Sequence, residues 1–183
     1  MSARLPAVPS SIRLPDGFRA AGLHCGLKRP PALDLGLLLA DQPVAADALF
    51  TKNRLLGAHI PVCRDHLGKS GGRARAILVN ARNANCATGQ QGIDAAYHCC
   101  AELARRIGCP EEQVLMASTG PIGAPLPSAR IVDNLDTLLD RASPDGGMDF
   151  ARAIMTTDTQ PKAVHAEGEV RVTGFAKGSG MIH

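Results

Sequence analysis

The segment from Gln90 to Ile107 constrains the fold more than any other part of the chain, because its sequence specifies a helix with one apolar face. Apolar residues recur there at helical spacing, namely Ile93, Ala96 or Tyr97, Cys100, Leu103 or Ala104, and Ile107. Arg105 and Arg106 occupy the last turn, where cations interact favourably with the helix dipole, and Gly108 with Pro110 ends the helix. Such a helix must cover a core, so other elements have to pack against it.

Short apolar runs bounded by turn residues predict strands in the rest of the chain. The predicted strands lie at residues 18–27, 33–40, 44–50, 73–79 and 113–118, although the alanines of 44–50 also permit a helix. Further helices are expected at 128–142, with Ser128 as the N-cap, and at 148–155, and a hairpin turning at Gly168 is expected over 164–172. Because strands and helices do not alternate regularly, we predict an α+β fold, a layered αββα-type sandwich, and not a doubly wound sheet.

The composition limits both the core and the partners. With no Trp, one Tyr and four Phe, the core has to be built from Ala, Leu, Ile and Val. The 183 residues suffice for one domain, expected over 18–183, after an extended, weakly ordered arm at 1–17 that contains several prolines. The net charge of +3 is small and the cations are spread along the chain, so nucleic acid is not an expected partner.

The six Cys and six His residues show none of the paired short spacings of a zinc site, so no metal site is predicted. The cysteines are expected to be buried as small hydrophobic residues, without disulfides. The N-terminal residues lack the apolar core of a signal peptide, and no apolar run approaches membrane-spanning length. The sequence therefore predicts a protein of the reducing cytoplasm with no membrane partner.

The last stretch, residues 172–183, runs from an apolar strand into a loop with one cation, Lys177, and three glycines. Glycines permit close backbone approach, so the loop is suited to lining a site where Lys177 meets a carboxylate or phosphate. The alternative is a solvated surface lysine. Met181 and Ile182 follow with nothing after them to pack against, which is typical of a piece of a longer polypeptide, although a simple boundary or a disordered tail explains it equally well.

An asparagine-rich loop follows the strand predicted at 73–79. It spans Asn80 to Gly89 and carries Asn83 and Asn85 at near-alternate positions. Asparagine side chains both donate and accept hydrogen bonds and tolerate left-handed backbone geometry, so the loop can hold polar ligand groups. A turn held by its own asparagine side chains is the simpler explanation for each residue individually.

Two further polar turns could carry chemistry. The turn from Thr119 to Gly123 follows a predicted strand, and its free backbone N–H groups, with the Thr119 hydroxyl, could point at a developing oxyanion, although such strand-to-loop turns are common. The segment Thr156 to Thr159 crowds hydroxyls around the carboxylate of Asp158, which could bond to a ligand or form a capping turn.

Four blocks of the chain, in order, resemble the ornithine acetyltransferase family, the bifunctional arginine-biosynthesis enzymes also called glutamate N-acetyltransferases. The blocks are Asn80–Gly89, Ser118–Gly120, Ala153–Thr159 and Ala176–Ile182. The likeness covers most of the chain from about residue 18 onward. Two positions depart from the family pattern, since Arg82 stands where a small residue is usual and Pro121 where a small aliphatic residue is usual.

The resemblance implies acetyl transfer from N-acetylornithine to glutamate by a ping-pong mechanism. In the family a precursor cuts itself in front of a threonine, which becomes the nucleophile at the start of the second chain. By the same likeness Thr119 and Gly120 form the oxyanion hole, Thr156 helps to hold the substrate, and Lys177 binds its α-carboxylate. No metal or organic cofactor is implied, and whether acetyl-coenzyme A also serves as a donor is left open.

On this interpretation the chain is the α chain of the precursor, completed by a β chain in an α2β2 heterotetramer. Two alternatives stay open. A related self-processing amidohydrolase would use the same threonine chemistry but pass the acyl group to water. A non-catalytic binding module would use the glycine loop only to dock a partner.

Overall fold

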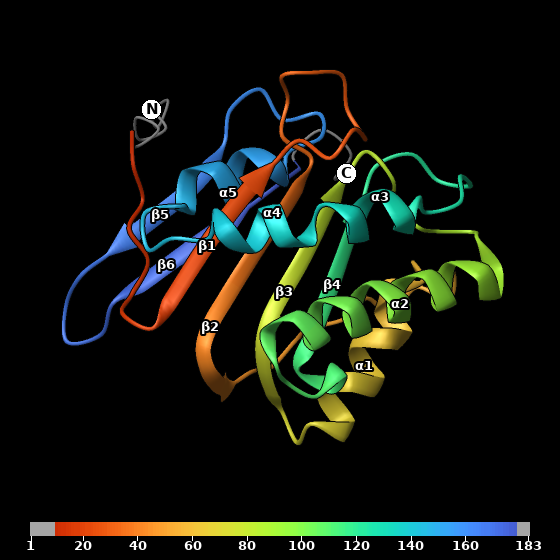
Figure 1. Ribbon diagram of the computed structural model, residues 1–183, viewed down its shortest axis with the longest axis horizontal. Helices are drawn as coiled ribbons and strands as arrows, with labels where there is room; N and C mark the ends of the chain where they lie inside the picture. Colours follow the sequence, from red (N-terminus) through yellow and green to blue (C-terminus); the bar gives the residue numbers. More distant parts are fainter. Residues whose placement is uncertain (1–9, 179–183) are drawn as a thin grey trace.

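The computed structural model describes residues 10–178, whose arrangement is shown in Figure 1. The strands are β1 (Phe18–Leu23), β2 (Leu35–Ala45), β3 (Arg73–Ala81), β4 (Val114–Thr119), β5 (Lys162–Ala166) and β6 (Val172–Ala176). The helices are α1 (His59–Lys69), α2 (Gly89–Ile107), α3 (Ser128–Asp133), α4 (Leu135–Asp140) and α5 (Gly147–Ala153), with a short 3-10 helix, η1 (Glu111–Gln113). The predictions that concern residues 1–9, Met181 and Ile182 lie outside the described residues.

The strands form two sheets. β1 to β4 make one sheet in chain order, in which β1, β2 and β3 are antiparallel neighbours and β4 joins β3 in parallel. The parallel pair needs a crossover connection, and α2 provides it. β5 and β6 form a separate antiparallel sheet of two strands, as the predicted hairpin requires.

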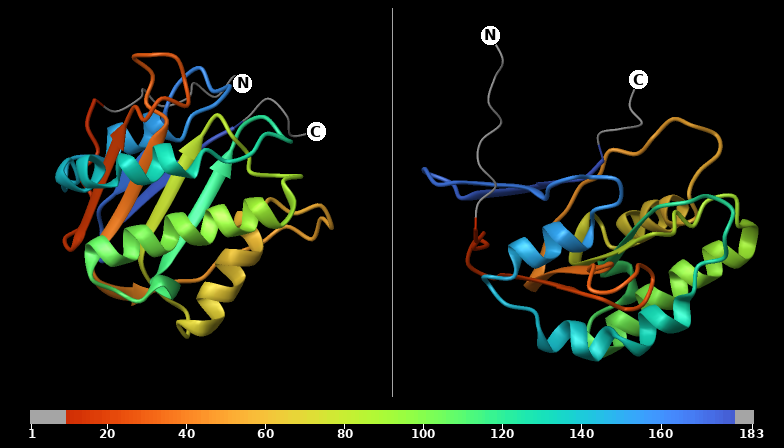
Figure 2. Two further views of the ribbon diagram at one scale, coloured as in Figure 1. Left: turned by 45° about the vertical axis from the view of Figure 1, so that its right-hand side comes forward. Right: turned by 90° about the horizontal axis from the view of Figure 1, so that it is seen from above.

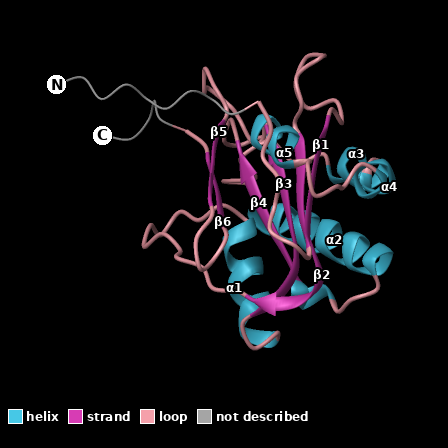
Figure 3. Ribbon diagram, turned by 90° about the vertical axis from the view of Figure 1, so that its left-hand side faces the viewer, coloured by secondary structure: helices cyan, strands magenta, loops and turns pink. Residues whose placement is uncertain are grey.

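Helices cover one face of the large sheet, and the small sheet lies beyond the other. Figures 2 and 3 show α2, α3 and α4 on one side of the sheet, with α5 and the β5–β6 hairpin on the opposite side. Successive side chains of a strand point to opposite faces, so Leu37 packs under the helices whereas Leu38 faces α5. The predicted layered α+β fold and the aliphatic core are both confirmed.

The described part of the predicted N-terminal arm is docked on the domain. Ile12 and Leu14 are buried, with exposed fractions of 3% and 6%. The Leu14 N–H donates to the Pro144 carbonyl at 2.8 Å, and Ile12 forms a bridge with Gly146. This stretch therefore covers the start of α5.

Two predicted elements differ from the structure. The strand expected at 44–50 is wrong, because β2 passes a bulge, pairs Val44 and Ala45 with β3, and then ends. The helix expected at 128–142 is divided into α3 and α4 at Asn134, whose side-chain amide donates to the Arg130 carbonyl at 2.8 Å. Ser128 is the first residue of α3 and makes no side-chain capping bond, so its predicted role as N-cap is also wrong.

The sequence patterns missed helix α1. Pro61 lies in its first turn, where backbone N–H groups have no partner within the helix and proline is tolerated. Of the cysteines, Cys25, Cys63, Cys99 and Cys100 are buried as predicted, whereas Cys86 and Cys109 are partly exposed. Across residues 10–178 every helix is too short or too polar to span a membrane.

Candidate active site

The structure brings together three of the residues that the sequence singled out. Lys177 directly follows β6, Thr119 ends β4, and Thr156 lies in the loop after α5. The ammonium Nζ of Lys177 donates to Thr119 Oγ1 at 2.5 Å and to Thr156 Oγ1 at 3.0 Å. The cluster therefore joins the large sheet, the small sheet and the loop between α5 and β5.

The ammonium of Lys177 is available for an anion. Within residues 10–178 its hydrogen-bond partners are the two threonine hydroxyls, and no carboxylate forms an ion pair with it. An ammonium has three donors, so one remains after these bonds are made. A half-buried cation of this kind, held by neutral groups, suits the carboxylate of a small substrate.

Thr119 and Gly120 present two hydrogen-bond donors at the end of β4. Because Thr119 Oγ1 accepts a hydrogen bond from Lys177, its own hydroxyl hydrogen is directed away from the ammonium and is free to donate. No hydrogen bond within residues 10–178 uses the Gly120 N–H. Adjacent free donors beside a cation can stabilise an oxyanion.

Close packing against the asparagine-rich loop fixes this turn. A Cβ atom on Gly120 would lie 2.4 Å from both the carbonyl carbon of Arg82 and the nitrogen of Asn83, and Gly120 has a φ of 146°. The Asn83 N–H donates to the Thr119 carbonyl at 3.1 Å. Arg82 has a φ of 74° and an exposed side chain. The arginine that stands where the family usually has a small residue therefore extends into solvent.

The asparagines hold the turn from behind. Asn80 accepts from the Ser118 hydroxyl at 2.6 Å and donates to the Asn83 carbonyl at 2.9 Å. Asn83 donates to the carbonyls of Ala124 and Pro125 at 3.2 and 3.0 Å. Both asparagines are buried, so they position the Thr119–Gly120 turn and do not face a ligand. The simpler explanation of this loop is therefore the one that the structure shows.

Asp158, also singled out by the sequence, is buried next to the cluster. Its carboxylate accepts hydrogen bonds from Lys162 Nζ and from the N–H groups of Gly178 and Thr156. Burial opposes ionisation of this carboxyl, but these hydrogen bonds outweigh it and lower the pKa of Asp158 to about 2. Of the two roles expected for this carboxylate, the structure shows turn formation.

An open pocket of about 590 Å³ lies between the two sheets beside Lys177. Its lining residues are Leu38, Ile77, Val79, Ala117, Ser118, Thr119, Phe150, Ile154, Thr173, Phe175 and Lys177. In the described part of the chain this lining offers hydroxyls and one ammonium on an apolar wall, but no carboxylate, imidazole or thiol.

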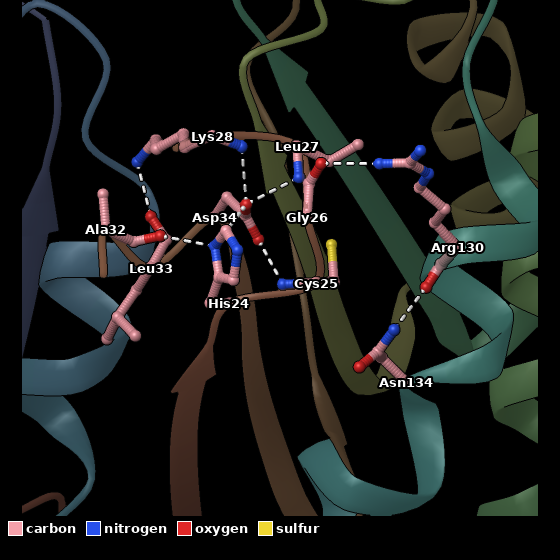
Figure 4. Close-up of polar contacts among 10 residues, drawn as sticks. All are labelled: His24, Cys25, Gly26, Leu27, Lys28, Ala32, Leu33, Asp34, Arg130 and Asn134. Carbon is pink, nitrogen blue, oxygen red and sulfur yellow. Dashed lines mark hydrogen bonds and ion pairs between the residues drawn. The ribbon is translucent and has the colours of Figure 1, made fainter. Parts of the chain in front are cut away.

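Sequence patterns did not single out the loop between β1 and β2, although it lies close to the site. Figure 4 shows the buried carboxylate of Asp34 at the centre of this loop. Asp34 accepts from the backbone N–H groups of Cys25, Leu27 and Lys28 at 2.6 to 2.8 Å, and its own carbonyl accepts from the Ala81 N–H at 2.8 Å. The carboxylate of Asp34 thus holds the loop together, and its backbone carbonyl ties the loop to the end of β3, where the asparagine-rich loop begins.

Lys28 brings a second ammonium toward the site. Its Nζ donates to the Leu33 carbonyl at 2.6 Å, on the far side of Asp34 from Arg130 (Figure 4). Burial lowers the pKa of Lys28, while Asp34 and Asp158 act to raise it and Lys177 acts to lower it. Lys28 is therefore within electrostatic range of the Lys177 cluster. Its position in a turn between two strands gave no indication in the sequence that it lies near the site.

Comparison with known proteins gives a consistent picture. A family model described as "ArgJ family" matches residues 19–183. The arginine biosynthesis bifunctional protein ArgJ of one Prochlorococcus marinus strain is 39% identical over 187 aligned residues, which cover 100% of this chain and 45% of that protein. The ArgJ protein of Caldanaerobacter subterraneus is 43% identical, over 94% of this chain and 43% of its own length. The chain thus spans less than half the length of these relatives.

Solved structures show the same fold. The crystal structure of the arginine biosynthesis bifunctional protein ArgJ from Bacillus halodurans superposes with a TM-score of 0.82 at 36% identity, over 92% of this chain and 90% of that one. The ornithine acetyltransferase of Mycobacterium tuberculosis, complexed with ornithine, superposes with a TM-score of 0.86 at 34% identity, over 92% of each chain.

Proposed function

The chain belongs to the ArgJ family, and on that premise we propose that it provides the oxyanion hole and the carboxylate-binding lysine of an acetyltransferase. The enzyme moves an acetyl group from N-acetylornithine to glutamate, a reaction of arginine biosynthesis in the cytoplasm. The observation that carries this proposal is the position of the Lys177 ammonium between Thr119 and Thr156, beside the free Gly120 N–H.

The chemistry is a double displacement through a covalent intermediate. A nucleophilic hydroxyl attacks the acetyl carbonyl of N-acetylornithine, the carbon–nitrogen bond breaks, and ornithine leaves with the proton. The amine of glutamate then attacks the acetyl ester, the carbon–oxygen bond breaks, and the hydroxyl regains its proton. Both steps pass through a tetrahedral oxyanion, which Thr119 and Gly120 stabilise. Both substrates carry an α-carboxylate, which Lys177 binds, and Thr156 helps to hold the substrate backbone.

The nucleophile is supplied by a second chain. The described lining of the pocket contains no carboxylate, imidazole or thiol to activate a hydroxyl, and the curated relatives are more than twice as long as this chain. We propose that a longer precursor cuts itself in front of a threonine, whose hydroxyl becomes the nucleophile and whose new α-amine is the base. The two products assemble as an α2β2 heterotetramer in which the β chain completes the sandwich.

Intact-mass spectrometry of the purified full-length protein, combined with an assay of acetyl transfer from N-acetylornithine to glutamate, tests the proposal. Two fragments, with the second beginning at threonine, together with transfer are the expected result. Two fragments that release acetate without forming N-acetylglutamate would identify a hydrolase. A single, inactive chain would overturn the proposal in favour of a binding module.

A further inference from the structure

One buried carboxylate lies between the two segments that carry Thr156 and Lys177. Asp158 Oδ2 accepts from the backbone N–H of Thr156 at 3.2 Å. Asp158 Oδ1 accepts from the backbone N–H of Gly178 at 2.7 Å and from Lys162 Nζ at 2.5 Å. Each oxygen of the carboxylate thus holds one of the two segments, although they are about twenty residues apart in the sequence.

Lys162 also binds Gly178, the residue after Lys177. Besides its ion pair with Asp158, its ammonium donates to the Gly178 carbonyl at 3.1 Å. The Asp158–Lys162 pair therefore holds both backbone polar groups of Gly178, which has a left-handed φ of 78° that suits glycine.

Lys162 contacts the residues on both sides of Lys177. In the β5–β6 pairing, Lys162 lies opposite Ala176, the residue before Lys177. The side chain of Lys162 then reaches Gly178, the residue after it. The backbone of Lys177 is consequently held between two points that both involve Lys162.

The burial of Asp158 makes this arrangement specific. Its side chain is 1% exposed, whereas that of Lys162 is 40% exposed. A buried carboxylate is costly unless every oxygen is hydrogen-bonded, and here each oxygen has a donor. The hydrogen bonds from Thr156, Lys162 and Gly178 therefore stabilise the ionised carboxylate while these residues keep their positions around it.

We propose that the Asp158–Lys162 ion pair is a positioning element that sets the distance between Lys177 and Thr156, and thereby the affinity of the site for a substrate carboxylate. The inference rests on the proposed function of Lys177 and Thr156. Neither Asp158 nor Lys162 lines the pocket, and both act through Lys177, which does line it, and through Thr156, which bonds to Lys177. The Asp158–Lys162 pair thereby maintains the hydrogen bond of 3.0 Å between Lys177 Nζ and Thr156 Oγ1.

Asp158→Asn is the sharpest test because it keeps the shape of the side chain. An asparagine has one oxygen and one NH2 group, so the NH2 must face either the Thr156 N–H or both the Gly178 N–H and the Lys162 ammonium. On one side of the side chain two hydrogen-bond donors then face each other, so the contact on that side is lost. Lys162→Met removes only the ammonium, and Lys162→Arg retains a cation as the conservative control.

The experiment uses the full-length protein and measures kcat and KM for glutamate in acetyl transfer. We expect Asp158→Asn to raise KM about tenfold or more with a smaller fall in kcat, Lys162→Met to raise it less, and Lys162→Arg to restore most of the loss. In a Lys177→Ala background the additional effect of Asp158→Asn should shrink, because its main route of action is gone. Equal effects in both backgrounds, or no change in KM, would overturn the proposal.

Hydrogen exchange of the Gly178 amide, followed by mass spectrometry, gives a readout that does not depend on activity. Exchange should be faster in Asp158→Asn and in Lys162→Met than in the unmodified protein or Lys162→Arg. Unchanged exchange would show that the pair does not hold this residue. If the unmodified protein shows no acetyl transfer, the proposed function fails, whereas an active protein with unchanged KM and exchange in the variants rejects the positioning role alone.

Discussion

The Nζ atom of Lys177 lies 2.5 Å from the Oγ1 atom of Thr119, although the two residues are 58 positions apart, with Thr119 at the end of β4 in the large sheet and Lys177 directly after β6 of the small sheet. The contact couples the group that we propose binds an anion to the group that we propose donates to an oxyanion. On this proposal, the charge on Lys177 attracts a carboxylate, and its hydrogen bond leaves the Thr119 hydrogen directed away from the ammonium and able to donate.

Lys177→Ala should reduce kcat/KM for acetyl transfer to glutamate by roughly 10- to 150-fold, because a hydrogen bond to a charged group contributes about 1.5 to 3 kcal/mol. Steady-state kinetics over a range of glutamate concentrations checks this. Lys69→Ala is the matched control, because Lys69 ends α1 as an exposed side chain and does not line the pocket. Equal activity of the Lys177→Ala and Lys69→Ala variants would show that Lys177 does not bind the substrate.

Thr119→Val should lower kcat about 100- to 1,000-fold, the loss typical of removing one oxyanion-hole donor. Valine has nearly the shape of threonine, so packing at the end of β4 is preserved while the hydroxyl is lost. Thr119→Ser keeps the hydroxyl and should retain most of the rate. A valine variant with normal kcat would show that Thr119 makes no bond to the transition state.

Gly120→Ala should destabilise the protein by about 2 kcal/mol or more, because the new methyl group would lie 2.4 Å from the backbone of Arg82 and Asn83. Thermal unfolding of the variant measures this, and acetyl transfer should fall at the same time because the turn has to move. Gly68→Ala in α1 is the control, since its Cβ meets no atom within 4 Å and alanine favours a helix by up to about 1 kcal/mol. A stable, active Gly120→Ala variant would contradict the close packing seen here.

The sequence predicted the long helix and most strands because their apolar residues recur at a regular spacing. Helix α2 ends at Ile107 and is capped by Gly108 in a left-handed conformation, as the predicted end of the helix required, and the β5–β6 hairpin turns between Ala166 and Val172, around the predicted Gly168. Helix α1 was not predicted, and its burial depends on contacts with β4 and α2 that no local pattern encodes.

The site was predicted only as separate pieces. Thr119, Thr156 and Lys177 were each identified from a local segment and a resemblance, and no pattern showed that the three side chains meet. The grip of Asp158 on Gly178 depends on the register of β5 and β6, which a sequence pattern fixes only to within a residue or two. Residue types therefore predicted which side chains are candidates for the site, whereas their arrangement in space could be seen only in the structure.

The low pKa of Asp158 predicts how the stability of the fold depends on pH. Burial acts to raise this pKa, but the hydrogen bonds from Lys162, Thr156 and Gly178 lower it from 3.8 to about 2. The unfolded chain thus binds the proton more tightly, so the stabilisation is complete above about pH 4 and is lost as pH falls toward 2. The difference in unfolding free energy between the unmodified protein and Asp158→Asn should shrink by about 2 kcal/mol across that window. Denaturant unfolding at successive pH values measures it, with the exposed Asp145→Asn as the control. A difference that stays constant below pH 4 would show that Asp158 is not held in its ionised form.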